Sequence, residues 1–116
     1  MEVKQNIIVT KTFNFSKEII KLYISLKRDK VFELASQVIR SATSIGANVE
    51  EAQAAQSKRD FISKMSIAAK EARETRYWLR LLHETAITEK EVEHLLKEVE
   101  EIINILTKIV KTSSSN

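Results

Sequence analysis

The sequence contains no cysteine and no proline, and it has a single glycine among its 116 residues. The missing cysteine excludes disulfides, thiolate metal sites and cysteine nucleophiles. One glycine cannot build the Gly-rich loops that cradle phosphates, so Walker-type and dinucleotide-binding motifs are excluded as well. Scarce glycine and proline also argue against a hairpin-rich β fold, because tight turns need these residues. The composition predicts a small helical protein of one domain.

Long hydrophobic runs are also missing. No stretch approaches the ~18 apolar residues that a transmembrane helix needs. The apolar run at residues 7–9 is too short for the core of a signal peptide. We therefore expect a cytoplasmic protein with no membrane partner.

Apolar residues recur at alternating spacings of three and four along four segments, which is the period of an amphipathic helix. We predict helices over about 14–28, 30–55 and 57–83, and a fourth from 88 to about 110. Ser16 is the expected N-cap of the first, Ser57 with Asp60 caps the third, and Thr88 with Glu91 forms a capping box for the fourth. Lys30 ends the polar run that makes the first turn.

Short links between long helices favour antiparallel neighbours. The predicted fold is therefore all-α, an antiparallel up-down-up-down four-helix bundle over residues 13–111. Residues 1–12 are expected to be loosely ordered, and residues 112–116 form a Ser-rich tail that we expect to be disordered.

The first predicted helix is apolar on two sides. Phe13, Ile20 and Ile24 fall nearly opposite the positions that face the core, and a helix of this kind usually touches two neighbours. Gly46 in the middle of the second helix indicates close backbone packing, because glycine there costs about 1 kcal/mol relative to alanine. We interpret Phe13, Ile20 and Ile24 as an oligomer interface. The alternative is that they are isolated exposed side chains, which are normal on protein surfaces.

The residue spacing gives little support for a catalytic site or a metal site. Glu91-x-x-His94 has the spacing of di-metal four-helix proteins, but the sequence has one such motif where two are needed, and His94 points away from the core. We interpret the pair as surface residues, and His83 as a surface histidine. The carboxylates of Glu71 and Glu74 are best explained as surface charge. We expect no metal, no cofactor, no small-molecule substrate and no enzymatic activity.

A cationic side of the third helix is the clearest candidate site. Basic groups flanking an aromatic ring can hold a phosphate backbone and stack on a base. The candidates are Arg59, Lys70, Arg73, Tyr77 and Arg80. Two carboxylates, Glu74 and Glu84, lie four residues from Lys70 and Arg80 and would partly neutralise this side. The alternative is a solvated surface that binds nothing.

Several segments resemble a known family. The most specific are SIGAN at 44–48 and ETRYWL at 74–79, inside longer similar stretches at 40–52 and 57–82. The opening FNFS at 13–16 and the KLY at 21–23 fit as well. Together they resemble the 23S rRNA intervening-sequence proteins, which are four-helix bundles, over residues 13 to about 87.

The resemblance implies a homopentamer with a role around RNA, and no enzyme. A relative of that family, the accessory variability protein of diversity-generating retroelements, is a basic pentamer that binds nucleic acid. This chain is less basic at +3, although five copies would carry about +15. Two functions stay open: an RNA- or DNA-binding accessory protein, or an oligomeric protein-interaction scaffold without nucleic acid.

Overall fold

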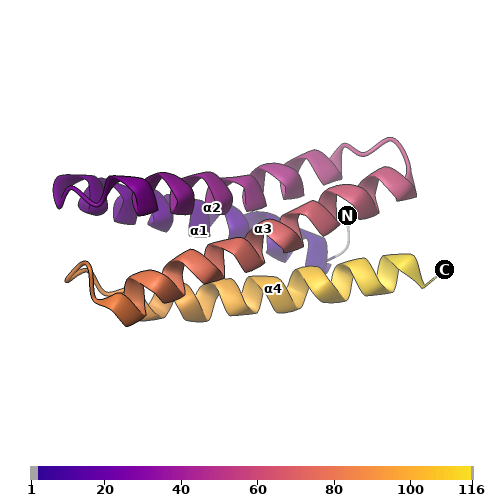
Figure 1. Ribbon diagram of the computed structural model, residues 1–116. Helices are drawn as coiled ribbons and strands as arrows, with labels where there is room; N and C mark the ends of the chain where they lie inside the picture. Colours follow the sequence, from indigo (N-terminus) through magenta and orange to yellow (C-terminus); the bar gives the residue numbers. More distant parts are fainter. Residues whose placement is uncertain (1–2, 116) are drawn as a thin grey trace.

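The computed structural model describes residues 3–115 and consists of four long helices. They are α1 (Val3–Arg28), α2 (Phe32–Gln53), α3 (Lys58–Thr85) and α4 (Glu93–Ser114). The helices run nearly along one axis and alternate in direction, so both chain ends lie toward the end of the bundle that holds the α2–α3 connection (Figure 1). The molecule measures 47 × 20 × 20 Å.

Each helix packs against the two that neighbour it around the bundle. The contacting pairs are α1–α2, α2–α3, α3–α4 and α1–α4, while within residues 3–115 the two diagonal pairs make no close backbone approach. This square arrangement of antiparallel neighbours confirms the predicted up-down-up-down four-helix bundle. Its core is lined by the apolar positions of all four helices, among them Phe15, Ile45, Leu79 and Leu106, which are almost completely buried.

The first helix is longer than predicted. Residues 3–12, expected to be loosely ordered, form the first turns of α1, and Ile8 and Thr12 are buried. The apolar spacing of three and four residues is interrupted at Thr12, because this polar residue occupies a core position. Its hydroxyl donates a hydrogen bond to the carbonyl of Ile8 at 2.7 Å, so it can be buried at little cost. Residues 1 and 2 of the predicted loose segment lie outside the described residues, and Ser16, the expected N-cap, lies in mid-helix.

Of the two helix caps predicted in the second half of the chain, the structure contains one. Ser57 caps α3 as predicted, its hydroxyl accepting the N–H of Asp60 at 3.0 Å. The capping box at Thr88 is wrong, because α4 begins five residues later with Val92 as its N-cap. Val92 is buried, so its packing holds this helix start in place of the cap predicted at Thr88.

Helix α4 extends into the segment predicted to be a disordered tail. Helix α4 continues to Ser114, and the hydroxyl of Ser115 donates to the carbonyl of Lys111 at 2.7 Å. The helix therefore extends more than one turn beyond Ile109, its last buried residue. Residue 116 lies outside the described residues.

Gly46 faces α1, the helix that packs beside α2. A Cβ at this position would stand 3.4 Å from the hydroxyl of Ser16 and 3.5 Å from the carbonyl oxygen of Thr12. These are ordinary van der Waals distances, so α1 packs against Gly46 but would also leave room for the Cβ of an alanine.

Candidate nucleic-acid interface

The five predicted binding residues lie on one exposed side of α3. That side is opposite the buried residues Met65, Ala72 and Leu79, because successive residues of an α-helix are 100° apart. Every candidate is exposed, and together they extend for about 30 Å along the helix. We call this set the α3 cationic face: Arg59, Lys70, Arg73, Tyr77 and Arg80.

The cations at the edges of α3 are neutralised by neighbouring helices. Lys64 forms an ion pair with Glu51 of α2 at 3.0 Å, and Arg76 forms one with Glu100 of α4 at 2.9 Å. The hydrogen bond from Lys64 to Glu51 raises the pKa of the lysine. The carboxylates of Glu51 on α2 and Glu100 on α4 are therefore paired with cations at the edges of α3, where neighbouring helices meet.

The outward cations have no such partners. In the part of the chain that the structure describes, Arg59, Lys70 and Arg73 form no ion pair with a carboxylate, and Arg80 meets only Glu84 at 3.5 Å. Both members of that pair are largely exposed, and exposed pairs contribute about 0–1 kcal/mol. The α3 cationic face therefore keeps most of its positive charge.

Glu74 explains why Lys70 is left unpaired. Instead of turning outward to Lys70, its carboxylate binds the guanidinium of Arg40 on α2 and accepts the indole N–H of Trp78 at 3.0 Å. A charged acceptor with two donors is held more firmly than an exposed pair on one helix. The predicted neutralisation of Lys70 by Glu74 is therefore wrong, and the face is more basic than the sequence suggests.

A polar cluster behind the face joins α3 to α2. Arg40 also lies 3.6 Å from Glu71, and the buried hydroxyl of Thr75 donates to that of Ser41 at 2.9 Å. The sequence predicts surface charge for Glu71 and Glu74, and this cluster was not predicted. The one signal was that Arg40 is the only charged residue between positions 34 and 49.

Tyr77 is the aromatic member of the face and is 55% exposed. Its ring meets that of Trp78 edge-on, with centroids 5.1 Å apart and planes at 69°. The half-buried Trp78 is fixed in turn by its bond to Glu74. More than half of the tyrosine therefore stays open to solvent, and an aromatic ring in this state can stack on a base.

A second outward surface lies on α1. Phe13, Ile20 and Ile24 are 60%, 42% and 52% exposed, whereas Phe15, Ile19 and Leu22 of the same helix are buried. The ammonium group of Lys17 lies 5.5 Å from the ring centre of Phe13. We call Phe13, Ile20 and Ile24 the α1 apolar face. Its exposure agrees with the sequence prediction, while its use as an interface stays a prediction.

An ion-pair cluster holds α1 against α4. The ammonium group of Lys11 lies 2.7 Å from Glu98 and 2.8 Å from Glu101. Partial burial lowers the pKa of Lys11, but the hydrogen bonds and charges of the two carboxylates outweigh it and raise that pKa overall. The hydrogen bond that Lys11 donates to Glu101 lowers the pKa of this glutamate. A surface hollow of about 370 Å³ borders this cluster, and His94 is among the residues that line it.

The Glu91-x-x-His94 spacing does not assemble a metal site. His94 is exposed on α4 and is not among the described residues whose ligand atoms gather. Glu91 lies instead beside Glu93 and His83, and His83 is exposed, as expected of a surface histidine.

The geometry defines a class of protein: an all-α bundle with one cationic and one apolar outward face. Within the described residues, none of the helices combines the length and apolarity that crossing a bilayer needs. The model of the 23S rRNA-intervening sequence protein family matches residues 4–108, and the chain belongs to this family.

A solved structure is similar over nearly the whole chain. It is a protein of unknown function from the S23 ribosomal protein family of Bacteroides thetaiotaomicron, 43% identical, with a TM-score of 0.87. The match covers 94% of this chain and 99% of that one. No curated protein matches the sequence. The family resemblance noted in the sequence is thereby confirmed.

Proposed function

We propose that the protein is a non-enzymatic, self-associating nucleic-acid-binding protein that holds RNA on the α3 cationic face. The observation that carries the proposal is the set of outward cations without carboxylate partners, gathered around an exposed tyrosine. Phosphates would pair with Lys70 and Arg73, and a base would stack on Tyr77. The name of the family, which refers to 23S rRNA, favours RNA over DNA.

The charge distribution supports a polyanion as the partner. The net charge of +3 is modest. The ion pairs between helices use Lys64 and Arg76 of α3 together with carboxylates of α2 and α4, and Arg59, Lys70 and Arg73 stay without a carboxylate partner among the described residues. Repeated copies of such a face in an oligomer would add their phosphate contacts, and affinity for nucleic acid grows with the number of contacts.

Salt dependence tests this proposal against the alternative, an oligomeric protein-interaction scaffold. The wild-type chain is titrated into a fluorescent fragment of structured 23S rRNA between about 50 and 200 mM salt, and anisotropy is measured. Binding through phosphates predicts a linear fall of log K with log[salt], with a slope of about −0.9 for each phosphate contact. The scaffold predicts no binding at any of these salt concentrations.

Self-association is the second part of the proposal and rests on the α1 apolar face. Three large apolar side chains exposed on one side of a helix are typical of a surface that contacts another protein. We propose that the α1 apolar face packs against other copies of the chain, with the pentamer implied by the family resemblance as the expected assembly. Light scattering behind a sizing column measures the mass directly, and a mass of one chain contradicts the proposal.

A further inference from the structure

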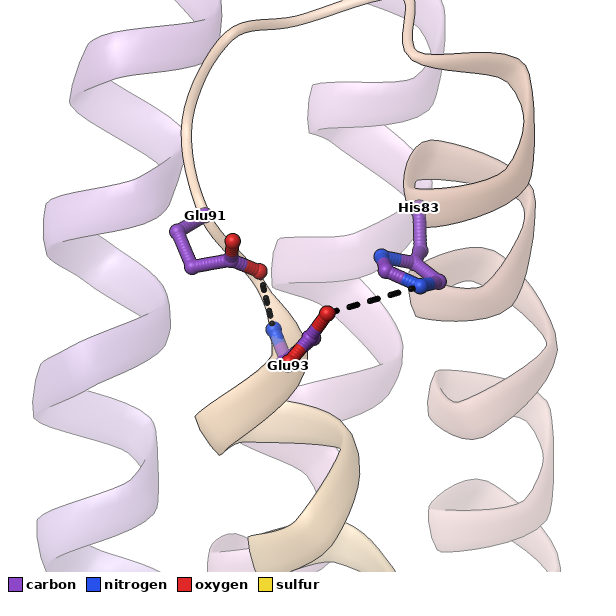
Figure 2. A group of neighbouring side chains, drawn as sticks. All are labelled: His83, Glu91 and Glu93. Atoms are coloured by element: carbon purple, nitrogen blue, oxygen red, sulfur yellow. Dashed lines mark hydrogen bonds and ion pairs between the residues drawn. The ribbon is translucent and has the colours of Figure 1, made fainter.

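Three side chains with metal-binding atoms meet where α3 passes into α4. His83 lies in the last turns of α3, Glu91 in the connection and Glu93 at the start of α4 (Figure 2). One ligand atom from each lies within 4.8 Å of the others. The Nε2 atom of His83 is 3.9 Å from a carboxylate oxygen of Glu93, too far for a hydrogen bond.

The backbone of the connection places these groups together. Ala86 adopts a left-handed conformation, with φ of 51°, and turns the chain out of α3. One carboxylate oxygen of Glu91 accepts the backbone N–H of Glu93 at 2.9 Å (Figure 2). This bond holds the Glu91 carboxylate beside the other two side chains. Orientation before binding reduces the entropy that binding costs.

The charges of the two glutamates are not neutralised by protein. Among the side chains that the structure describes, neither Glu91 nor Glu93 forms an ion pair with a lysine or arginine, and the imidazole of His83 is the basic group that lies 3.9 Å from Glu93. Imidazole and carboxylate together suit zinc and similar divalent transition metals. Zinc binds such atoms at about 2.0–2.2 Å, so small rotations of these exposed side chains would bring all three onto one ion.

We propose that His83, Glu91 and Glu93 form a binding site for a divalent transition-metal ion of the zinc class. His83 supplies nitrogen, the glutamates supply oxygen, and water completes the coordination because the site is exposed. The ion fastens the end of α3 to the start of α4. This inference is independent of nucleic-acid binding, since none of its three residues belongs to the α3 cationic face.

The sequence provides a matched control, because His83 and His94 are its only histidines and both are exposed. The tag-free full-length chain is stripped with a chelator and titrated with Zn²⁺ by calorimetry, and with Co²⁺ by visible absorption. The site predicts one ion per chain. We expect His83→Ala to weaken Zn²⁺ binding tenfold or more, and His94→Ala to leave it unchanged.

Glu91→Gln provides a second test. Its amide oxygen can still accept the N–H of Glu93, so the connection keeps its shape while the charge is lost. This variant should also weaken Zn²⁺ binding at least tenfold, and it decides the matter if His83→Ala fails to fold. The proposal is overturned if the wild-type chain shows no saturable Zn²⁺ binding below 1 mM (about 4 kcal/mol of binding free energy). It is equally overturned if His94→Ala weakens binding as much as His83→Ala.

Discussion

The outward sides of α1 and α3 differ in the chemistry of their exposed side chains. The α1 apolar face exposes Phe13, Ile20 and Ile24, whereas the α3 cationic face exposes arginines, a lysine and one tyrosine. Both helices are otherwise alike, long and amphipathic with one fully buried side. The difference indicates two kinds of partner. Apolar surface is best covered by protein, since burying it removes it from water, and unpaired cations are best matched by phosphates.

The largest expected effect comes from breaking the α1 apolar face. The double variant Ile20→Glu/Ile24→Glu places two charges where we expect contact between copies, so the mass measured by light scattering should fall to that of one chain. Because both side chains are exposed in a single chain, the free energy of unfolding should change by no more than about 1 kcal/mol. Lys21→Glu, on an exposed and charged part of the same helix, is the matched control and should keep the wild-type mass.

An unchanged mass in the double variant would show that Ile20 and Ile24 do not form the interface.

The next effect concerns the aromatic member of the α3 cationic face. Tyr77→Ala should weaken binding of the 23S rRNA fragment roughly 5- to 150-fold, because stacking on one base is worth about 1–3 kcal/mol. Tyr77→Phe keeps the ring and should bind like wild type. The measurement is anisotropy at one fixed salt concentration. Equal losses in both variants would assign the effect to the hydroxyl group rather than to stacking.

A smaller effect tests why the α3 cationic face keeps its charge. Glu74→Gln weakens the contacts with Arg40 and Trp78 and should lower the free energy of unfolding by about 1 kcal/mol. RNA affinity should stay within about twofold, because the Glu74 carboxylate faces α2 rather than Lys70. Chemical denaturation and anisotropy measure the two quantities. A rise of tenfold in RNA affinity would mean that Glu74 neutralises Lys70 after all.

The smallest effect concerns the cluster that holds α1 against α4. Lys11→Met should cost less than about 1 kcal/mol near neutral pH, since the carboxylates are partly exposed. The lowered pKa of Glu101 makes its contribution to stability present above its ordinary value of 4.5 and lost as the pH falls through the folded-state value. The raised pKa of Lys11 makes its contribution present below 10.5 and lost as the pH rises through the folded-state value.

The difference in stability between wild type and Lys11→Met should therefore be constant from about pH 5 to 10 and shrink on either side. Denaturation at a series of pH values measures it. Lys21→Met, which removes a pair within one exposed helix turn, should show almost no difference at any pH. A Lys11→Met difference that ignores pH would point to lost packing instead.

The bundle could be predicted from spacing alone, because each helix repeats its apolar residues at intervals of three and four. The ends of the helices could not. Thr12 occupies a core position as a polar residue satisfied by its own helix, so the first turns of α1 did not show as a continuation of the pattern. At the start of α4, the buried side chain of Val92 outweighs the capping signal at Thr88.

The common position of the five residues on α3 could be predicted from the sequence, but the pairing of their charges could not. A helical wheel places the five residues of the α3 cationic face together, and the structure agrees. Sequence spacing paired Glu74 with Lys70, four residues away, because it sees only contacts within one helix. The competing contact with Arg40 joins α2 to α3 and needs the packed bundle. The same limit applies to His83 and Glu93, which the fold of the connection brings together.

The central claim is that RNA is held on the α3 cationic face. It is tested most directly by the salt dependence of RNA binding in a variant that replaces two cations of this face by neutral glutamines. Lys70→Gln/Arg73→Gln is compared with wild type and with Lys108→Gln/Lys111→Gln, which removes the same charge from exposed positions on α4. Losing two phosphate contacts should make the slope of log K against log[salt] shallower by about 2, while the α4 control keeps the wild-type slope. Equal slopes in all three proteins would contradict the account.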